Sequence, residues 1–250
     1  MKEEIYIVEY ENFDVNEIKS KFYEWIDTRK DTPRNFKDEM RLMGIKPYYI
    51  PCYVCNLKID LNYNIKVQKR YKLRRGMSTI TNEKGQFSAK DYPLFASQVI
   101  PRYDMDQIAP FDFSKMNISG YEKKQAPKEK FIQTYDDCLN HYKGAIVKNL
   151  EELINNNLLK ENSKEMKKKF HSENSHEIET MEIYQVLVPI WVCKYSYKME
   201  TYHCILNGQN DKMFGHTPTK KIDKVFRWII GILLVAIIIV FAFIYLEKRK

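Results

Sequence analysis

The sequence predicts an α+β protein with two antiparallel β-segments separated by a long helix, plus one C-terminal transmembrane helix. Three observations support this prediction. Residues 48–125 and 181–219 contain runs of β-branched and aromatic residues divided by turn residues, as strands do. Between them, apolar residues recur at helical spacing over residues 126–160. Residues 225–246 form an apolar run whose last part, Trp228–Leu246, carries no charge.

Residues 1–47 are expected to form a strand and helices. The strand is predicted from the apolar run Ile5 to Val8. Asp14, with Glu17 three residues later, has the pattern of a capping box that opens a helix ending near Arg29. The apolar stripe of this helix favours packing in a core over a partner-binding groove.

The first β-segment contains a basic stretch from Lys66 to Arg75. Alternation along a strand would place four of its basic residues on one face: Lys66, Arg70, Lys72 and Arg74. A solvated strand face is the simplest interpretation, and contact with anionic lipid headgroups is the functional one. Nucleic acid is disfavoured because Tyr71 alone does not provide a stacking platform.

The polar residues 161–180 are interpreted as a helix tail and linker, followed by a β-meander over residues 181–219. Within the meander, Asn207 and Gly208 form the dipeptide that most strongly signals a type I′ hairpin turn, which needs positive φ at both positions. We therefore predict a tight structural turn there. The alternative is that Asn207 and Gln209 present their side chains to a ligand.

The uncharged run Trp228–Leu246 predicts a membrane span that binds the lipid bilayer. A helix of this length rises roughly 28 Å, enough to cross a hydrocarbon core. Trp228 and Tyr245 stand near its two ends, where aromatic side chains favour the headgroup region. The N-terminus lacks the apolar core of a signal peptide, so the prediction is a single-pass, tail-anchored protein with the bulk of the chain in the cytosol.

The composition supports a folded domain and gives no enzyme signature. The chain has 250 residues, 44% of them hydrophobic and 14% aromatic, with a formal net charge of +8. That content is ample for a packed core, and the positive charge suits an anionic surface. We find no phosphate-binding loop, nucleophile elbow or dinucleotide fingerprint, and only eight glycines in all. No catalytic residue and no cofactor is therefore predicted.

Two sets of metal-ligating residue types were weighed against structural interpretations. Cys52 and Cys55 have zinc-knuckle spacing, and His203 with Cys204 could complete a tetrad. However, alternation in a strand places Cys52 and Cys55 on opposite faces, so no metal site is predicted. The odd total of five cysteines suits reduced thiols. A second cluster has no ligand spacing and is interpreted as solvated: His171, His176, Glu177, Glu179 and Glu182.

Three segments of the chain carry a resemblance to a known family: Tyr48–Val54, Gln185–Val192, and Tyr202–Gln209 with Lys212, Gly215 and Pro218. They resemble segments of an uncharacterised bacterial family of zinc-ribbon-type membrane proteins. The most specific part is the C-terminal segment, where the family reads P-V-W followed by N-G-Q-T-G-K. The family's N-terminal zinc ribbon has no counterpart in this chain, and Asn210-Asp211 replaces the family's Thr-Gly. The resemblance implies architecture and no activity.

The sequence thus predicts a membrane-anchored, non-enzymatic interaction or scaffold module with an unknown protein partner. The alternatives are a membrane-tethered enzyme or a small-ligand-binding domain. A tethered nucleic-acid binder is the weakest alternative.

Overall fold

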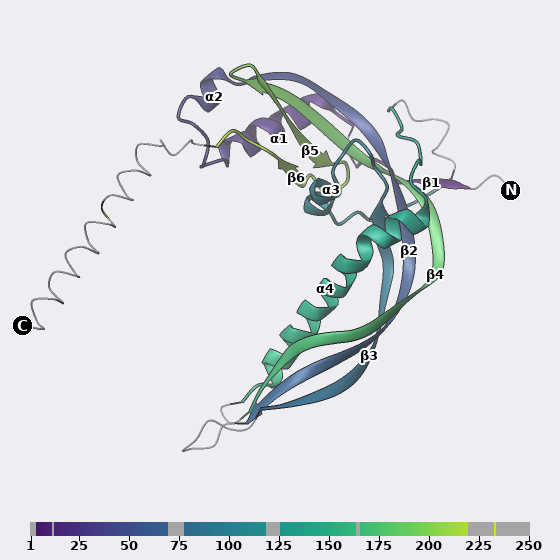
Figure 1. The fold of residues 1–250 in the computed structure, drawn as a ribbon. Helices are drawn as coiled ribbons and strands as arrows, with labels where there is room; N and C mark the ends of the chain where they lie inside the picture. The colour runs from purple at the N-terminus through teal and green to yellow at the C-terminus, as the bar shows by residue number, and fades with distance from the viewer. Residues whose placement is uncertain are drawn as a thin grey trace, which may run out of the picture.

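The computed structural model describes residues 4–11, 13–69, 78–118, 126–163, 166–219 and 233. Its main feature is a single, strongly curved sheet that forms an arc, with helix α4 (Tyr135–Glu161) lying inside the curve (Figure 1). The strands of the sheet are β1 (Ile5–Ile7), β2 (Arg41–Lys69), β3 (Ser78–Phe95), β4 (Met166–Tyr197), β5 (Glu200–Asn207) and β6 (Met213–Gly215).

The strand order is β3-β2-β4-β5-β6, with β1 beside β4. The neighbours along that path run antiparallel, whereas β1 is parallel to β4. β2 and β4 pair from Arg41 opposite Ser196 to Lys69 opposite Met166, which joins strands from the two halves of the sequence.

The predicted fold class is therefore wrong. The two β-segments are not separate units on either side of a helix, because β2 and β4 pair along almost their whole length in one sheet. Residues 166–180, expected to belong to a linker, form the first half of β4. The polar composition of these residues predicted a linker because one face of this part of the sheet is open to solvent. Among residues 166–180, Phe170 is buried and the others are partly or fully exposed. Periodicity predicts strands, but it does not say which strands pair.

The predicted transmembrane helix and the single-pass membrane localisation are also corrected. Across the described ranges, no helix is both long and apolar enough to cross a bilayer. The longest, α4, carries charges through its middle, including Lys148, Glu151 and Glu152. Apart from Leu233, the run Trp228–Leu246 lies outside the described residues. The structure therefore does not support the predicted tail-anchored, single-pass membrane protein.

Side chains at the N-cap positions determine where the two longer helices begin. Asp14 caps α1 (Val15–Asp27) by accepting a hydrogen bond from the Asn16 amide, so the predicted start of this helix is confirmed. Thr134 and Asp137 form a capping box at the start of α4, eight residues beyond the predicted start near residue 126. Two short helices complete the set, α2 (Phe36–Glu39) and α3 (Arg102–Ile108).

The arc has two regions. The body contains residues 41–55 of β2 and 183–197 of β4, together with β1, β5, β6 and α1 to α3. The ribbon contains residues 57–69 of β2, 78–90 of β3 and 166–180 of β4, covered on one face by the C-terminal half of α4.

In the body, the two sheet faces bury different helices. Trp191 and Tyr195 of β4 pack against Phe22 of α1 and its neighbours. The alternate residues Val188 and Ile190 belong to the main core on the opposite face, with α3 and α4. In the ribbon, by contrast, α4 packs on the concave face and leaves the convex face exposed.

Candidate binding site on the concave face

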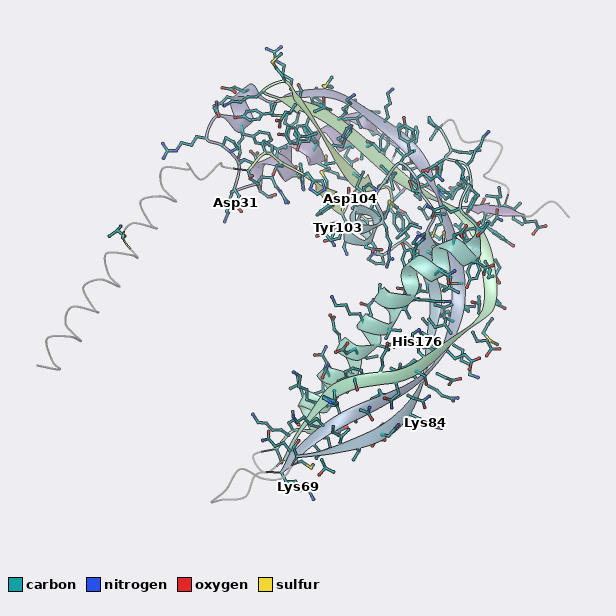
Figure 2. The ribbon with its side chains drawn as sticks, viewed as in Figure 1. Asp31, Lys69, Lys84, Tyr103, Asp104 and His176 are labelled. Carbon is teal, nitrogen blue, oxygen red and sulfur yellow. The ribbon has the colours of Figure 1, made fainter. Side chains whose placement is uncertain are left out.

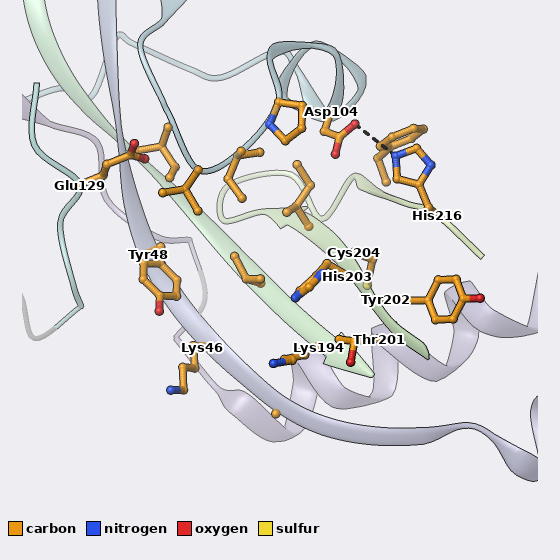
Figure 3. A pocket seen from close by; sticks show the side chains of 18 of the residues that line it. Lys46, Tyr48, Asp104, Glu129, Lys194, Thr201, Tyr202, His203, Cys204 and His216 are labelled. Carbon is orange, nitrogen blue, oxygen red and sulfur yellow. Dashed lines mark ion pairs between the residues drawn. The ribbon is translucent and has the colours of Figure 1, made fainter. Parts of the chain in front are cut away.

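A pocket of about 990 Å³ lies on the sheet face that carries α3 and α4. It is bounded by β2, β4 and β5 on the sheet side, with α3, β6 and residues 127–129 around it. Figure 3 shows side chains from three adjacent strands entering it, among them Lys46, Lys194 and His203. We call this the concave pocket.

The floor of the concave pocket continues the apolar core. Ile50 of β2 and Ile205 of β5 are buried, and Val192 of β4 is partly buried. Alternation explains the position of Val192, because Val188 and Ile190 on the same face of β4 already lie in the main core. Phe214 of β6 also lines the pocket and closes part of its side through an edge-to-face contact with Tyr103. The pocket can therefore take an apolar group.

Beyond this floor, the same sheet face carries a row of basic side chains. Lys194 of β4 lies directly opposite His203 of β5. Lys46 of β2 lies opposite Val192, two residues before Lys194 on β4, so the two lysines are diagonal neighbours on this face. Lys46, Lys194 and His203 are all exposed. Among the described residues, no carboxylate lies within ion-pair distance of Lys46 or Lys194. Basic side chains gathered on one face without a carboxylate partner suit an anionic ligand.

The carboxylates around the pocket are already engaged. Glu129 accepts hydrogen bonds from the Ser97 hydroxyl and the Gln98 amide, both at 2.7 Å, and thereby holds the loop before α3. Asp104 of α3 stands 3.6 Å from Nε2 of His216, on the far wall of the pocket (Figure 3). These acids position the wall and do not neutralise the lysine row.

Gly44 leaves space on the sheet face beside Lys194. It lies opposite Lys194 in the register of β2 and β4, and it lines the pocket. A Cβ atom built at this position would meet nothing within 4 Å. A large side chain at residue 44 could therefore enter the pocket without a steric clash at its Cβ.

The predicted turn at Asn207 and Gly208 has a different structure from the type I′ hairpin. Neither residue has positive φ, and the loop runs from Gly208 to Lys212, with Asp211 at φ 60°. The two-residue turn geometry is therefore wrong. Asn207 is fully buried at the end of β5, and its amide donates to the carbonyl oxygens of Ile108 at 2.8 Å and Pro110 at 3.1 Å.

Gln209 is engaged in the same way. Its side chain accepts from the Asp112 amide at 2.9 Å and donates to the Asp112 carbonyl at 3.1 Å. The Asn207 side-chain oxygen also accepts from the Gln209 amide at 2.8 Å. Asn207 and Gln209 therefore both hold the loop that follows α3. This structural role explains their side chains without the alternative of a ligand.

The basic stretch is only partly described. Lys66 is exposed on β2, where it lies directly opposite Lys169 of β4. Arg70, Lys72 and Arg74 lie outside the described residues. The structure adds Lys167 and Lys169 to the same end of the ribbon, through strand pairing that the sequence did not reveal.

The residues considered as a zinc tetrad do not lie close together: Cys52, Cys55, His203 and Cys204. Cys52 and Cys55 belong to the main core, whereas Cys204 lies opposite Cys193 in the core that packs against α1. His203 points to the other face of β5, toward the pocket. Burial raises the pKa of the Cys55 thiol to about 12 and that of Cys138 to about 11. No grouping of three or more His, Cys, Asp or Glu residues suited to a metal ion occurs in the described ranges.

The acid–imidazole cluster is spread along β4. Glu179 stands 3.8 Å from Lys58, and Glu182 accepts a 2.7 Å hydrogen bond from Asn56. His176 lies 3.8 Å from Glu173 on the ribbon (Figure 2). The first two contacts join β2 to β4, and the third lies within β4.

The sequence alone did not identify Lys46 or Lys194 as site residues, and it offered His203 only as a metal ligand. Lys46, Lys194 and His203 come from three strands and form no motif. The sequence around Lys194 held one indication. Alternation places Lys194 on the same face of its strand as the apolar residues Val188 and Ile190, which precede it. Such a charge indicates where the helical cover of a sheet ends.

The fold and the pocket together define a β-rich protein with an open pocket on the concave side of one curved sheet. The chain is 25% identical over 231 residues to the uncharacterized protein YdjG of Bacillus subtilis (strain 168). That match covers 86% of this chain, and the chain spans 64% of the relative's length. No family model matches the chain, and no solved structure matches it.

Proposed function

We propose that this chain is a non-enzymatic interaction module that captures an anionic group of its partner in the concave pocket. The observation that carries the proposal is the row of Lys46, Lys194 and His203 above an apolar floor. Basic groups at a pocket's rim orient an anionic ligand, and the apolar floor supplies contact area.

The engagement of the polar groups supports binding over catalysis. Glu129 and Asp104 are held by neighbouring groups of the pocket wall. The thiol of Cys204, the cysteine of the lining, is buried and faces the other side of the sheet. Thr201 supplies a hydroxyl, and no activating base is hydrogen-bonded to it among the described residues. A nucleophile without a positioned base is a poor basis for acyl or phosphoryl transfer.

The ligand chemistry follows from the pocket. It is a carboxylate, phosphate or sulfonate attached to an apolar body, carried by a protein segment or by a small molecule. A protein segment with acidic and apolar side chains is the occupant we favour, because the basic row crosses three strands and lies open to solvent.

Titration of the full chain with the fluorescent anion 1-anilinonaphthalene-8-sulfonate tests the proposal, because this probe joins a sulfonate to an apolar ring system. We expect saturable binding that weakens at least about tenfold in Lys46→Ala/Lys194→Ala, a change of about 1.4 kcal/mol. The matched control is Lys19→Ala/Lys90→Ala, which removes two exposed lysines elsewhere.

Gly44→Phe provides a second, steric test. The new ring should occupy the space above Gly44 and abolish probe binding while the urea midpoint of unfolding stays close to that of wild type. If the double lysine variant and Gly44→Phe both bind the probe as the control does, the concave pocket is not the binding site. A synthetic acidic peptide that displaces the probe would favour the protein segment, and displacement by a fatty acid alone would favour the small molecule.

A further inference from the structure

The free end of the ribbon carries a second concentration of positive charge, separate from the concave pocket. Its four lysines are exposed: Lys66 and Lys69 at the end of β2, and Lys167 and Lys169 at the start of β4. Lys69 lies at the very end of the ribbon, far from the body (Figure 2). We call these four residues the tip lysines.

The tip lysines are not compensated by acids. Lys66 and Lys169 lie directly opposite each other, and like charges in that position destabilise a sheet. Lys168, between two of them, is paired with Glu161 of α4 at 2.8 Å. In the described part of the chain, no carboxylate lies within ion-pair distance of the tip lysines. Their mutual repulsion is relieved when an anionic partner binds.

An exposed apolar side chain lies within this charge. Ile80 of β3 is directly opposite Lys66 on its other side, and it is 54% exposed. Strand pairing therefore places Ile80, Lys66 and Lys169 in one line across the convex face. Basic side chains beside an exposed aliphatic one suit the boundary between phospholipid headgroups and acyl chains.

The charge changes sign along the same face. Nearer the body, Glu177 lies opposite Asp60, and Glu179 lies opposite Lys58. Asp60 is six residues from Lys66, which corresponds to roughly 20 Å along a strand. That distance exceeds the screening length of about 8 Å in physiological salt. A nucleic acid lying along the ribbon would meet these carboxylates, whereas a flat anionic surface touching the end would meet the tip lysines and Ile80 before it reached Asp60 or Glu177.

We propose that the tip of the ribbon binds the anionic headgroups of a phospholipid bilayer, end-on and peripherally, with Ile80 at the acyl boundary. This contact does not depend on the concave pocket. Each basic residue near an anionic leaflet strengthens binding about fivefold.

Co-sedimentation of the full chain with vesicles of phosphatidylcholine containing phosphatidylserine tests the proposal. The measured quantity is the difference in partition coefficient between two matched double variants, since each removes two lysines and keeps the rest of the chain. Lys167→Ala/Lys169→Ala should lower the partition coefficient about 30-fold, whereas the control Lys19→Ala/Lys90→Ala should change it less than about twofold. This difference should disappear in 1 M salt, where the screening length is about 3 Å.

Ile80→Ser separates the apolar contribution from the charge. It should lower binding several-fold, and this loss should persist in 1 M salt because it reflects burial of an aliphatic side chain. Gly44→Phe should bind vesicles as wild type does, so that failure of the pocket and failure of the tip are distinguishable.

Equal partitioning of the tip variant and the control would overturn the proposal. So would competition by a single-stranded oligonucleotide that depends on Lys167 and Lys169 while the vesicles show no difference, since the tip would then be a nucleic-acid contact.

Discussion

The body and the ribbon are built from the same two long strands, yet their sequence patterns differ. In the body, residues 49–55 of β2 are all buried, because helices or loops cover both faces of the sheet. In the ribbon, Leu57, Ile59 and Leu61 alternate with the less buried Lys58 and Asp60, because only α4 covers it. One strand can therefore show a continuous apolar run and then a strict alternation, according to what covers it.

This difference teaches where function can reside. In the body, the proposed binding site lies where the helical cover of the sheet ends, at the concave pocket. The ribbon keeps a whole polar face and concentrates positive charge at its end. Substitutions of buried residues in the body should therefore act mainly on stability, and substitutions on the exposed face of the ribbon mainly on binding.

The largest expected contrast is in thiol reactivity. All five cysteines are buried, four of them in strands of the body and Cys138 in the N-terminal half of α4, and burial raises the pKa of Cys55 to about 12. A Ser175→Cys substitution would place a reference thiol on the exposed face of the ribbon. At pH 8 an exposed thiol of pKa about 8.5 is roughly a quarter thiolate, so it should react more than about a thousandfold faster than Cys55.

Reaction with a disulfide reagent, followed at 412 nm under native conditions, measures this contrast. Peptide mapping identifies which cysteine has reacted. Rapid native labelling of Cys52, Cys55 or Cys193 would show that the body opens and that its two covered faces do not protect it.

The next contrast compares two asparagines. In the body, Asn207→Leu would leave the carbonyl oxygen of Ile108 without its donor, while the carbonyl oxygen of Pro110 would keep the Asn210 amide at 2.7 Å. We expect a loss of about 3 kcal/mol in unfolding free energy. In the ribbon, the Asn62 amide donates to the Ser175 hydroxyl at 2.8 Å in an exposed position. Asn62→Ala should cost about 0.5 kcal/mol.

Urea unfolding followed by circular dichroism gives both values. A cost for Asn207→Leu as small as that for Asn62→Ala would mean that water replaces the Asn207 amide, and the loop after α3 would not depend on it.

Two glycines give a smaller contrast of the same kind. A Cβ at Gly208 would lie 2.6 Å from the ring of Tyr10, which is fixed by hydrogen bonds from its hydroxyl to the carbonyls of Tyr48 and Ile190. A Cβ at Gly85 in the ribbon would meet the end of the Phe87 ring at 2.7 Å, which can rotate away. We expect Gly208→Ala to cost about 2 kcal/mol and Gly85→Ala less than about 1 kcal/mol.

Thermal unfolding of the two variants beside wild type checks this order. The reverse order would show that the ribbon packs more rigidly against α4 than the body packs around Tyr10. Equal stability of Gly208→Ala and wild type would remove steric packing as the reason for glycine at residue 208.

The sequence predicted the parts of this molecule that local chemistry determines. Asp14 caps α1 because its side chain reaches an amide two residues away. The pairing of β2 with β4 depends on residues more than a hundred positions apart, such as Asn62 and Ser175, and no local pattern specifies it. The pocket lysines were missed for the same reason, since Lys46 and Lys194 become neighbours only through that pairing.

The Asn207-Gly208 signal shows a different limit. The dipeptide lies at the end of a strand, but the buried Asn207 amide is bonded to the loop after α3 and the chain turns over the following residues. Tertiary hydrogen bonds to Ile108 and Pro110 outweigh the local preference for positive φ. Local propensity therefore identified the position of the turn and missed its geometry.

The smallest expected effect concerns the ion pair across the ribbon. Lys58 and Glu179 stand 3.8 Å apart, with 46% and 63% of their side chains exposed. Exposed pairs of this kind contribute about 0 to 1 kcal/mol, because solvent screens the charges and both side chains lose rotamer freedom. A double-mutant cycle with Lys58→Ala and Glu179→Ala should give a coupling energy below about 0.5 kcal/mol.

A larger coupling would mean that the convex face of the ribbon is drier than its exposure indicates, as it would be if a partner or a second copy covered it. Repeating the cycle at several protein concentrations separates these cases, because coverage by a second copy depends on concentration and an intrinsic ion pair does not. The cycle also gives a value to compare with that of Asn207. In the same sheet, the buried Asn207 amide should contribute several times more unfolding free energy than the exposed ion pair, because water competes for the ion pair and does not reach the amide.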